Sequence, residues 1–244
     1  MLKYNFLITI CYSFFLLFYS CGLKQKEVPI TTVRFNNLGE SGEHYDIQFP
    51  NDSVERDVPK LYHNNILYRE RRKIDSALNI GSLENGFEGQ QIRINGNEYK
   101  EYKNGWNRFL VFSNKGSWTA DVYYMRFAVQ DGFTQTIDSL QYQKYSLGDP
   151  KLGWNKFTDS LKHLGLFTLS DYSVVPGYGA DLNTDEFSYE VEIASKRKYR
   201  IYSYPQPAER IQKFSEAKKF MQVIEFIKSE FSFPKPWTPK NKAK

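Results

Sequence analysis

The feature that most constrains the fold is the alternation of apolar and polar residues between positions 87 and 147. "QQIRINGNEYKEY" places Asn95-Gly96 between two alternating runs, and this residue pair accepts the two positive φ angles of a type I′ turn. "WNRFLVFSNKGSWTADVYYMRFAV" repeats the pattern around a bend at residues 113–116, and "TQTIDSLQYQKYSL" adds another strand. The segment therefore predicts an antiparallel β-meander.

The return arm of the second hairpin divides into two faces, because successive strand side chains point in opposite directions. One face carries Trp118, Ala120, Val122, Tyr124 and Arg126, and the other carries Thr119, Asp121, Tyr123, Met125 and Phe127. Tyr123 and Tyr124 thus point to opposite faces, so at least one of them could be exposed.

Two helices are expected after the meander. Asp149 suits an N-cap and Pro150 the first helical position, and Gly165 suits the left-handed position that follows a helix. The second helix spans 208–231 and ends before "FPKPWTP". Each predicted helix has one apolar face, formed by Trp154, Phe157, Leu161 and Leu164 in the first and by Ile211, Phe214, Ala217, Met221, Ile224, Ile227 and Phe231 in the second.

Another hairpin lies between these helices, in "SYEVEIASKRKYRIYSYP", with its bend at residues 195–197. The run Ile30–Phe35 could add an edge strand, and "EHYDIQF" predicts a further strand. Residues 60–80 fit neither the helical nor the strand period. The predicted fold class is α+β, an antiparallel β-meander with two helices packed on one face.

Composition excludes two broad classes of protein. Of the 244 residues, 41% are hydrophobic and 17% aromatic, which supplies a packed core and excludes wholesale disorder. The 33 basic and 28 acidic residues are interspersed, whereas nucleic-acid binding requires a clustered basic stripe.

The segment "KPWTPKNKAK" is basic and Pro-rich, and we interpret it as a frayed end in preference to a docking segment.

The first twenty residues have a basic start at Lys3 and an apolar middle, as in a signal peptide. Leu17-Phe18-Tyr19-Ser20-Cys21 resembles the lipobox of a bacterial lipoprotein signal, although Phe18 and Tyr19 depart from the usual pattern. The resemblance implies cleavage before Cys21 and attachment of lipid, such as palmitate, to its thiol and new amine. An uncleaved anchor and plain secretion are the alternatives. The expected location is the bacterial cell envelope, at the outer membrane in preference to the inner one.

The expected organisation is a signal peptide at 1–20, a tether at 21–41, a single α+β domain at 42–234 with a possible subdivision near 149, and a basic tail at 235–244. After cleavage, the chain that follows Cys21 contains no further cysteine. Disulfides, a Cys-ligated zinc and a Cys nucleophile are therefore excluded for residues 22–244.

Four segments together resemble uncharacterised bacterial envelope lipoproteins: "LENGFEGQQIRI", "KGSWTADVYYMRF", "GWNKFTDSLKHLGLFTLSD" and "YEVEIASKRKYRIYSYPQP". The resemblance covers about residues 83–232 and is based on core and turn residues. It implies a lipoprotein with this fold. It carries no catalytic residue across, because the segments contain no reactive motif.

The clearest candidate for chemistry is "DLNTDEFSYEVE". Asp181, Asn183, Asp185 and Glu192 occupy positions 1, 3, 5 and 12 of an EF-hand-like Ca²⁺ loop. Glu186 stands where such a loop needs glycine, and the following segment is predicted as a strand. An acidic loop that leads into a hairpin is therefore the favoured interpretation. The histidines at 44, 63 and 163 do not form a ligand set.

A second candidate is the face formed by Arg200, Tyr202 and Tyr204, because Tyr and Arg are enriched in binding surfaces. The alternative, which we favour, packs these tyrosines under the last helix. We expect no cofactor and no nucleic-acid partner. The expected function is a lipid-anchored, non-enzymatic module for binding a protein or glycan. The alternative is a glycan hydrolase that uses Asp and Glu for acid–base chemistry.

Overall fold

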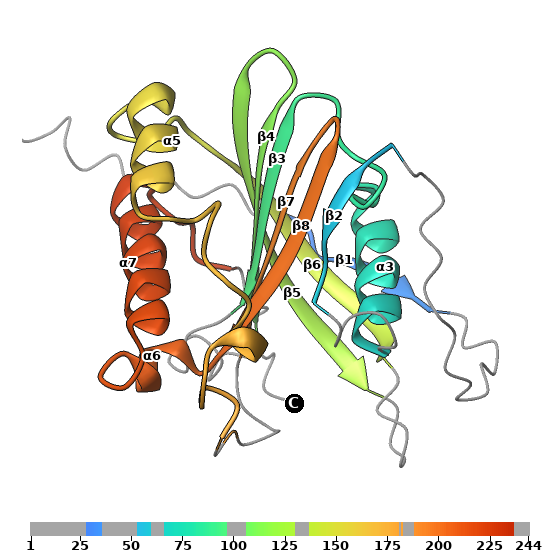
Figure 1. The fold of residues 1–244 in the computed structure, drawn as a ribbon. Helices are drawn as coiled ribbons and strands as arrows, with labels where there is room; N and C mark the ends of the chain where they lie inside the picture. The colour runs from blue at the N-terminus through green and yellow to red at the C-terminus, as the bar shows by residue number, and fades with distance from the viewer. Residues whose placement is uncertain are drawn as a thin grey trace, which may run out of the picture.

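One eight-stranded sheet organises the fold in the computed structural model (Figure 1). The structure describes residues 28–35, 53–59, 66–96, 106–129, 137–180, 182 and 188–236. The predicted signal peptide, Cys21 and the strand expected in "EHYDIQF" lie outside these residues. The described strands are β1 (Thr31–Arg34), β2 (Glu55–Asp57), β3 (Gln90–Gly96), β4 (Asn107–Asn114), β5 (Trp118–Val129), β6 (Ile137–Leu147), β7 (Ser188–Ser195) and β8 (Lys198–Pro205). The helices are α3 (Ile66–Leu78), α5 (Trp154–His163), α6 (Pro207–Arg210) and α7 (Ser215–Glu230), with a 3₁₀ turn η1 (Tyr172–Val174).

The sheet confirms the predicted meander. The strand order is β1-β6-β5-β4-β3-β7-β8-β2, so β3 to β6 are neighbours in chain order. All pairs are antiparallel except β2 with β8. Asn114 pairs with Trp118 across the bend of the β4–β5 hairpin, where Gly116 has a φ of 107°. The expected edge strand is also present as β1, within the range that the sequence assigns to the tether.

The predicted turn at Asn95-Gly96 is wrong. β3 continues through Gly96, which pairs with Arg108 of β4. Glycine is required there for another reason: a Cβ atom on Gly96 would lie 2.4 Å from Cδ1 of Tyr189 on β7. The residue therefore makes room for a ring on the neighbouring strand. Turn propensity is a local signal, and here long-range strand pairing overrides it.

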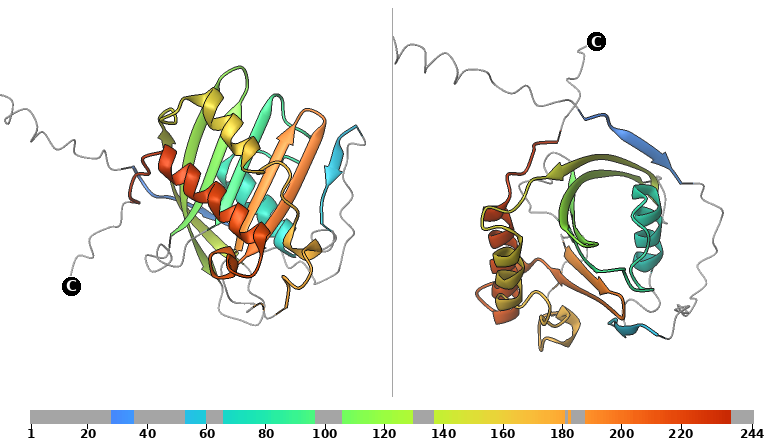
Figure 2. Two further views of the ribbon diagram at one scale, coloured as in Figure 1. Left: turned by 60° about the vertical axis from the view of Figure 1, so that its left-hand side comes forward. Right: turned by 90° about the horizontal axis from the view of Figure 1, so that it is seen from above.

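The sheet is curved, with α3 on its concave face and α5 and α7 on its convex face (Figure 2). On the convex face, Phe157 and Phe220 belong to a large apolar cluster with β-strand residues such as Phe112 and Val122. On the concave face, Ile74 and Leu78 of α3 join a second cluster with Phe109, Val111, Tyr123, Met125 and Leu140. α3 has no counterpart in the architecture predicted from the sequence.

The faces predicted for β5 are confirmed, since Tyr124 lies in the convex cluster and Tyr123 in the concave cluster. Neither ring is exposed: Tyr123 is 3% and Tyr124 is 6% accessible. The reason is that helices cover both faces of the sheet, which strand alternation by itself does not reveal.

The start of α5 differs from the prediction. Its N-cap is Gly153, with no side-chain cap. The Asp149 carboxylate instead accepts a hydrogen bond of 2.8 Å from Nε1 of Trp154. The predicted apolar face is confirmed by the buried Phe157 and Leu161, and the predicted left-handed glycine by a φ of 87° at Gly165.

The last predicted helix is in fact two helices, α6 and α7, separated by residues 211–214. Phe214 has extended backbone angles of −127° and 125°. The break turns its ring onto Tyr178, with ring centroids 4.7 Å apart, and the buried guanidinium of Arg210 donates to the carbonyl of Tyr178. Ile211, expected on the apolar stripe, is 37% exposed. An apolar stripe of helical spacing therefore did not reveal this break.

Candidate functional site

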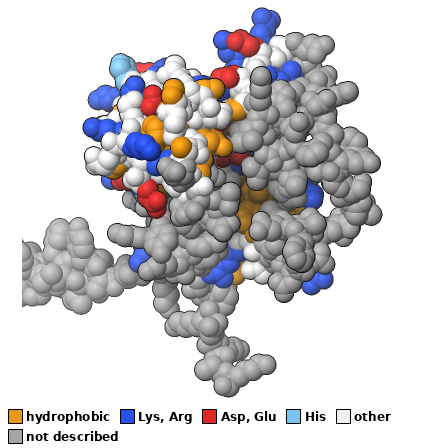
Figure 3. Space-filling view, turned by 60° about the horizontal axis from the view of Figure 1, so that its bottom comes forward, with side chains coloured by type: hydrophobic (Ala, Val, Ile, Leu, Met, Phe, Trp, Pro, Cys, Tyr) orange, Lys and Arg blue, Asp and Glu red, His pale blue; other side chains and the backbone are white. Residues whose placement is uncertain are grey.

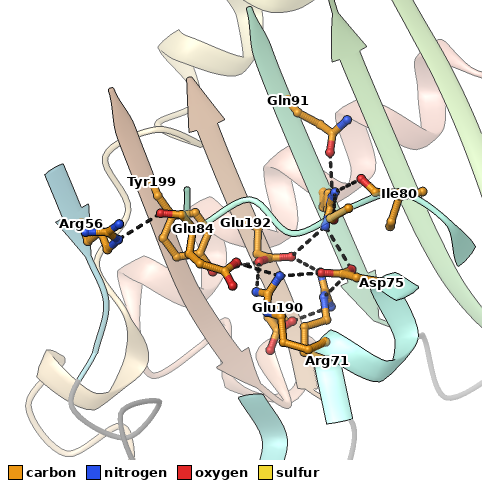
Figure 4. Close-up of polar contacts among 12 residues, drawn as sticks. Arg56, Arg71, Asp75, Ile80, Glu84, Gln91, Glu190, Glu192 and Tyr199 are labelled. Atoms are coloured by element: carbon orange, nitrogen blue, oxygen red, sulfur yellow. Dashed lines mark hydrogen bonds and ion pairs between the residues drawn. The ribbon is translucent and has the colours of Figure 1, made fainter. Parts of the chain in front are cut away.

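The inner face of α3 is unusual because charged residues alternate with apolar ones. Arg71, Ile74, Asp75 and Leu78 follow the i, i+3, i+4, i+7 spacing of a helical stripe, and all four are buried. Around the two charged residues lies a group that we call the ionic cluster (Figure 4). Its members are Arg71, Arg72, Asp75, Glu84, Arg93, Glu190 and Glu192.

Glu192 of β7 is at the centre of the ionic cluster and is fully buried. One carboxylate oxygen accepts a 2.5 Å hydrogen bond from Nη2 of Arg71. The other accepts bonds of 3.1 Å from Nη2 of Arg72 and 2.8 Å from the hydroxyl of Tyr199. Burial by itself raises the pKa of Glu192, but the surrounding arginines outweigh it and hold the pKa well below its usual range.

Arg71 joins α3 to β7 and β4. Its Nη1 atom donates to Glu190 at 2.5 Å, and its guanidinium lies 4.8 Å from the centre of the Phe109 ring. Burial lowers the pKa of Arg71, but the charges of Glu192, Glu190 and Asp75 outweigh burial and raise it. The guanidinium therefore stays charged inside the fold.

Asp75 shares its arginines with Glu192. Its carboxylate lies 2.6 Å from Nη1 of Arg72 and 3.0 Å from Nη1 of Arg93, and the same Arg93 atom is 3.8 Å from Glu192. Burial and the charge of Glu192 raise the pKa of Asp75 to about 6, against the lowering effect of the arginines. The two neighbouring carboxyls therefore have pKa values shifted in opposite directions.

Arg93 links β3 to the loop that follows α3. It is fully buried, donates through Nε to Gln91 at 2.7 Å, and donates through Nη2 to the carbonyls of Ile80 and Gly81 at 2.8 and 2.7 Å. Burial lowers its pKa. These bonds fix the position of the C-terminal end of α3 over β3.

The charges of the ionic cluster almost cancel. It contains three arginines and four carboxyls, so its formal charge is −1 when all are ionised and zero when Asp75 is protonated. The side chains of Glu190 and Arg72 are 17% and 19% exposed, whereas those of Arg93 and Glu192 are fully buried. A charge-balanced cluster of this kind attaches a helix to a sheet in one defined position.

Three members of the predicted Ca²⁺ loop, Asp181, Asn183 and Asp185, lie outside the described residues. The fourth, Glu192, belongs to the ionic cluster, where both of its oxygens accept hydrogen bonds. Within the described ranges, no group of three or more His, Cys, Asp and Glu residues is arranged to hold a metal ion.

The predicted binding residues of β8 are packed into the fold. Tyr202 and Tyr204 are fully buried, and the Tyr204 ring stacks on Phe220 of α7 at 5.0 Å. Their hydroxyls donate to the carbonyls of Leu166 and Ser170, and Arg200 donates to the carbonyl of Phe167 and to Asp57. The structure thus has the packed arrangement, and these residues hold the loop after α5 against β8.

A small pocket lies between α7 and the convex face, with room for roughly one water molecule. Arg108 and Lys228 contribute to it, and burial lowers the pKa of each. Its other lining residues are Ile94, Gly96, Leu110, Tyr189, Ile224 and Ile227. The surface shown in Figure 3 carries basic, acidic and apolar side chains interspersed over its coloured part.

Sequence reasoning missed the ionic cluster, although one signal for part of it was present. Arg71 and Asp75 are four residues apart on the stripe that carries Ile74 and Leu78, which is the spacing of a helical ion pair. Arg93 gave no comparable signal, because a charged residue between Ile92 and Ile94 is ordinarily taken as solvent-facing.

Comparison of the sequence with protein-family models finds no match, and neither do comparisons with curated proteins and with solved structures. Among the helices that the structure describes, none has the length and apolar character needed to cross a membrane.

Proposed function

We propose that this chain is a lipid-anchored protein of the bacterial envelope, at the outer membrane in preference to the inner one, whose folded part is a non-enzymatic module for binding a protein or glycan. The observation that carries the proposal is that the buried carboxylates already accept hydrogen bonds from side chains within the fold. Glu192 is fully enclosed and accepts from two arginines and a tyrosine. Groups engaged in this way stabilise a rigid domain and are not accessible to a polymeric substrate.

The anchor in this proposal is the thiol of Cys21, after removal of the signal peptide at 1–20. Attachment is tested by growing bacteria that express the chain with a labelled palmitate and by separating membranes from soluble fractions. The wild-type protein is expected to carry label and to sediment with membranes. Cys21→Ser is expected to lose the label and to leave the membrane fraction. A Cys21→Ser protein that stays membrane-bound and uncleaved would instead establish an uncleaved anchor.

The binding role is tested with the same detergent-solubilised protein and insoluble envelope glycan. Sedimentation reports retention, and released reducing sugar in the same tubes reports turnover. Retention without release supports a binding module. If glycan neither retains the protein nor is cleaved, chemical cross-linking in intact membranes is used to detect a protein neighbour, and its absence would contradict the proposed interaction role.

A second candidate is the glycan hydrolase, and one observation favours it. The pKa values of Asp75 and Glu192 are shifted in opposite directions, as in a catalytic acid–base pair. Both carboxyls are buried, so a substrate would reach them only if the concave face opened. Sugar release by the wild type that Asp75→Asn abolishes would establish this function. Asp121→Asn is the matched control, because Asp121 forms a more exposed pair with Lys144 on the same face.

A further inference from the structure

The pocket between α7 and the convex face of the sheet is lined by two cationic side chains. Arg108 comes from β4, on the same side of the strand as Leu110 of the convex cluster, because strand side chains alternate. Lys228 comes from the last turn of α7, the helix that covers this face in Figure 2. Among the described residues that line the pocket, both charged ones are therefore positive, one from the sheet and one from the helix.

Most of the remaining pocket wall is apolar. Ile94 and Leu110 of the sheet and Ile224 and Ile227 of α7 line it, and all four side chains are buried. An apolar wall lowers the local dielectric and so strengthens any charge interaction beside it. The space has room for roughly one water molecule, so a small group that enters it lies next to both cationic residues.

Arg108 is positioned by aromatic side chains. Its guanidinium lies 4.7 Å from the centre of the Phe233 ring and forms a hydrogen bond with the hydroxyl of Tyr124. That hydroxyl in turn donates to the carbonyl of Pro234. Burial outweighs the interactions with Tyr124 and Tyr189 and lowers the pKa of Arg108. The guanidinium is therefore fixed in place and partly desolvated, which favours binding of an anion over binding by a fully hydrated surface arginine.

Lys228 brings the second positive charge. Its Nζ atom lies 3.3 Å from the carboxylate of Glu225, whose side chain is 64% exposed. A pair with so exposed a carboxylate contributes little, and burial lowers the pKa of Lys228. An anion inside the pocket would stabilise the charged form of this ammonium group.

A carboxylate matches the two cations and the small space. A guanidinium binds both oxygens of a carboxylate as a fork, and the ammonium group of Lys228 adds a second charge-assisted contact. A phosphate carries four oxygens around its central atom and is larger. We propose that the pocket binds the carboxylate of a small organic acid, of about the size of acetate, through Arg108 and Lys228. This site depends neither on the lipid anchor nor on the ionic cluster of the concave face.

The first experiment locates acetate on the full-length protein, with ¹³C in the isoleucine methyl groups. Nuclear Overhauser contacts are expected between the acetate methyl group and the methyl groups of Ile224 and Ile227. Their absence at every acetate concentration that leaves the protein folded would overturn the proposal, since the pocket would then hold only water. Chloride cannot engage both arms of the guanidinium and should displace acetate at least about tenfold less effectively. Equally effective displacement by chloride would overturn a carboxylate site.

The second experiment measures acetate affinity in variants. Lys228→Gln removes one charge and is expected to weaken binding by roughly tenfold or more. Arg108→Lys keeps the charge but removes the fork, and should also weaken it. Lys162→Gln is the control, because Lys162 is 61% exposed in a surface pair with Asp159, and its affinity should equal that of the wild type. Equal affinity of wild type and Lys228→Gln would contradict the assignment. Thermal melting shows whether each variant is folded, and the contacts in the wild type test the site without any substitution.

Discussion

Arg71 of α3 and Glu192 of β7 are 121 positions apart in the chain, yet their side chains form a 2.5 Å ion pair in the interior. The pair joins α3, which lies on the concave face, to β7, which pairs with β3 and β8 within the sheet. Desolvation opposes the burial of each charge, so the pair persists only because the remaining members of the ionic cluster satisfy both groups. The position of α3 therefore depends on charge pairing as well as on Ile74 and Leu78.

Glu192→Gln is expected to lower the free energy of unfolding by about 3–5 kcal/mol, because it leaves two buried arginines without their central carboxylate. Urea unfolding at pH 7 measures the change. Asp121→Asn, which removes a more exposed pair with Lys144, is the control and should cost less than about 1 kcal/mol. Similar effects of the two substitutions would contradict a structural role for the ionic cluster.

Asp75 should make the fold less stable as pH rises. Its folded pKa of about 6 lies above its ordinary value of 3.8. Its contribution is therefore fully present below pH 3.8 and is lost as pH increases through 6, by about 3 kcal/mol. Glu192 acts in the opposite sense, since its lowered pKa contributes stability that is lost only in strong acid.

The difference in unfolding free energy between wild type and Asp75→Asn, measured from pH 4 to pH 8, isolates this contribution from other titrating groups. The wild type should lose stability relative to Asp75→Asn across that range. A constant difference between wild type and Asp75→Asn would show that the pKa of Asp75 is the same in the folded and unfolded states, which contradicts a raised folded pKa.

Gly96→Ala should destabilise the fold by about 1–3 kcal/mol, because the new methyl group would meet the Tyr189 ring at 2.4 Å. Thermal melting measures the change. Gly148→Ala is the matched control, since a Cβ there meets nothing within 4 Å and the backbone φ is not positive. If Gly96→Ala melts at the wild-type temperature, Tyr189 moves aside without cost and the proposed close approach has no consequence for stability.

Tyr124→Phe should release the segment at Pro234, because it deletes the hydroxyl that donates to that carbonyl. Limited trypsin digestion can cleave after Lys240 and Lys242 in both proteins, whereas the bond after Lys235 resists trypsin because Pro236 follows it. A further cut after Lys228 should appear sooner in Tyr124→Phe. Tyr145→Phe serves as a control, since its hydroxyl donates to Gln143 of β6. Identical digestion patterns would show that the packing of Phe233 is sufficient to hold this end.

The strands were predictable wherever their residues alternate. The two faces of β5 follow from the sequence, and so do the bend at Gly116 and the hairpin of β7 and β8, because strand period and turn chemistry act over a few residues. The apolar face of α5 could be predicted for the same reason. The helix α3 could not be predicted, since charged residues occupy half of its inner stripe and hide the apolar period.

The candidate site was largely beyond the sequence. The burial of the Tyr202 and Tyr204 rings was correctly favoured from the sequence, and the structure shows the Tyr204 ring stacked on Phe220 of α7. Arg93 and Glu192 occupy strands that alternate as expected, yet their burial follows from the placement of α3 over the concave face.

By itself the sequence determined the strands of the meander, the two faces of β5 and the apolar face of α5, and it predicted a lipid-attachment cysteine, because neighbouring residues carry those signals. The tertiary structure decided which charges meet. Arg93 and Glu192 face each other because β3 pairs with β7, and Arg71 and Asp75 reach them because α3 crosses the same strands. The physical reason is that a buried charge is stable only beside its partners, and those partners are brought together by strand order and not by distance along the chain.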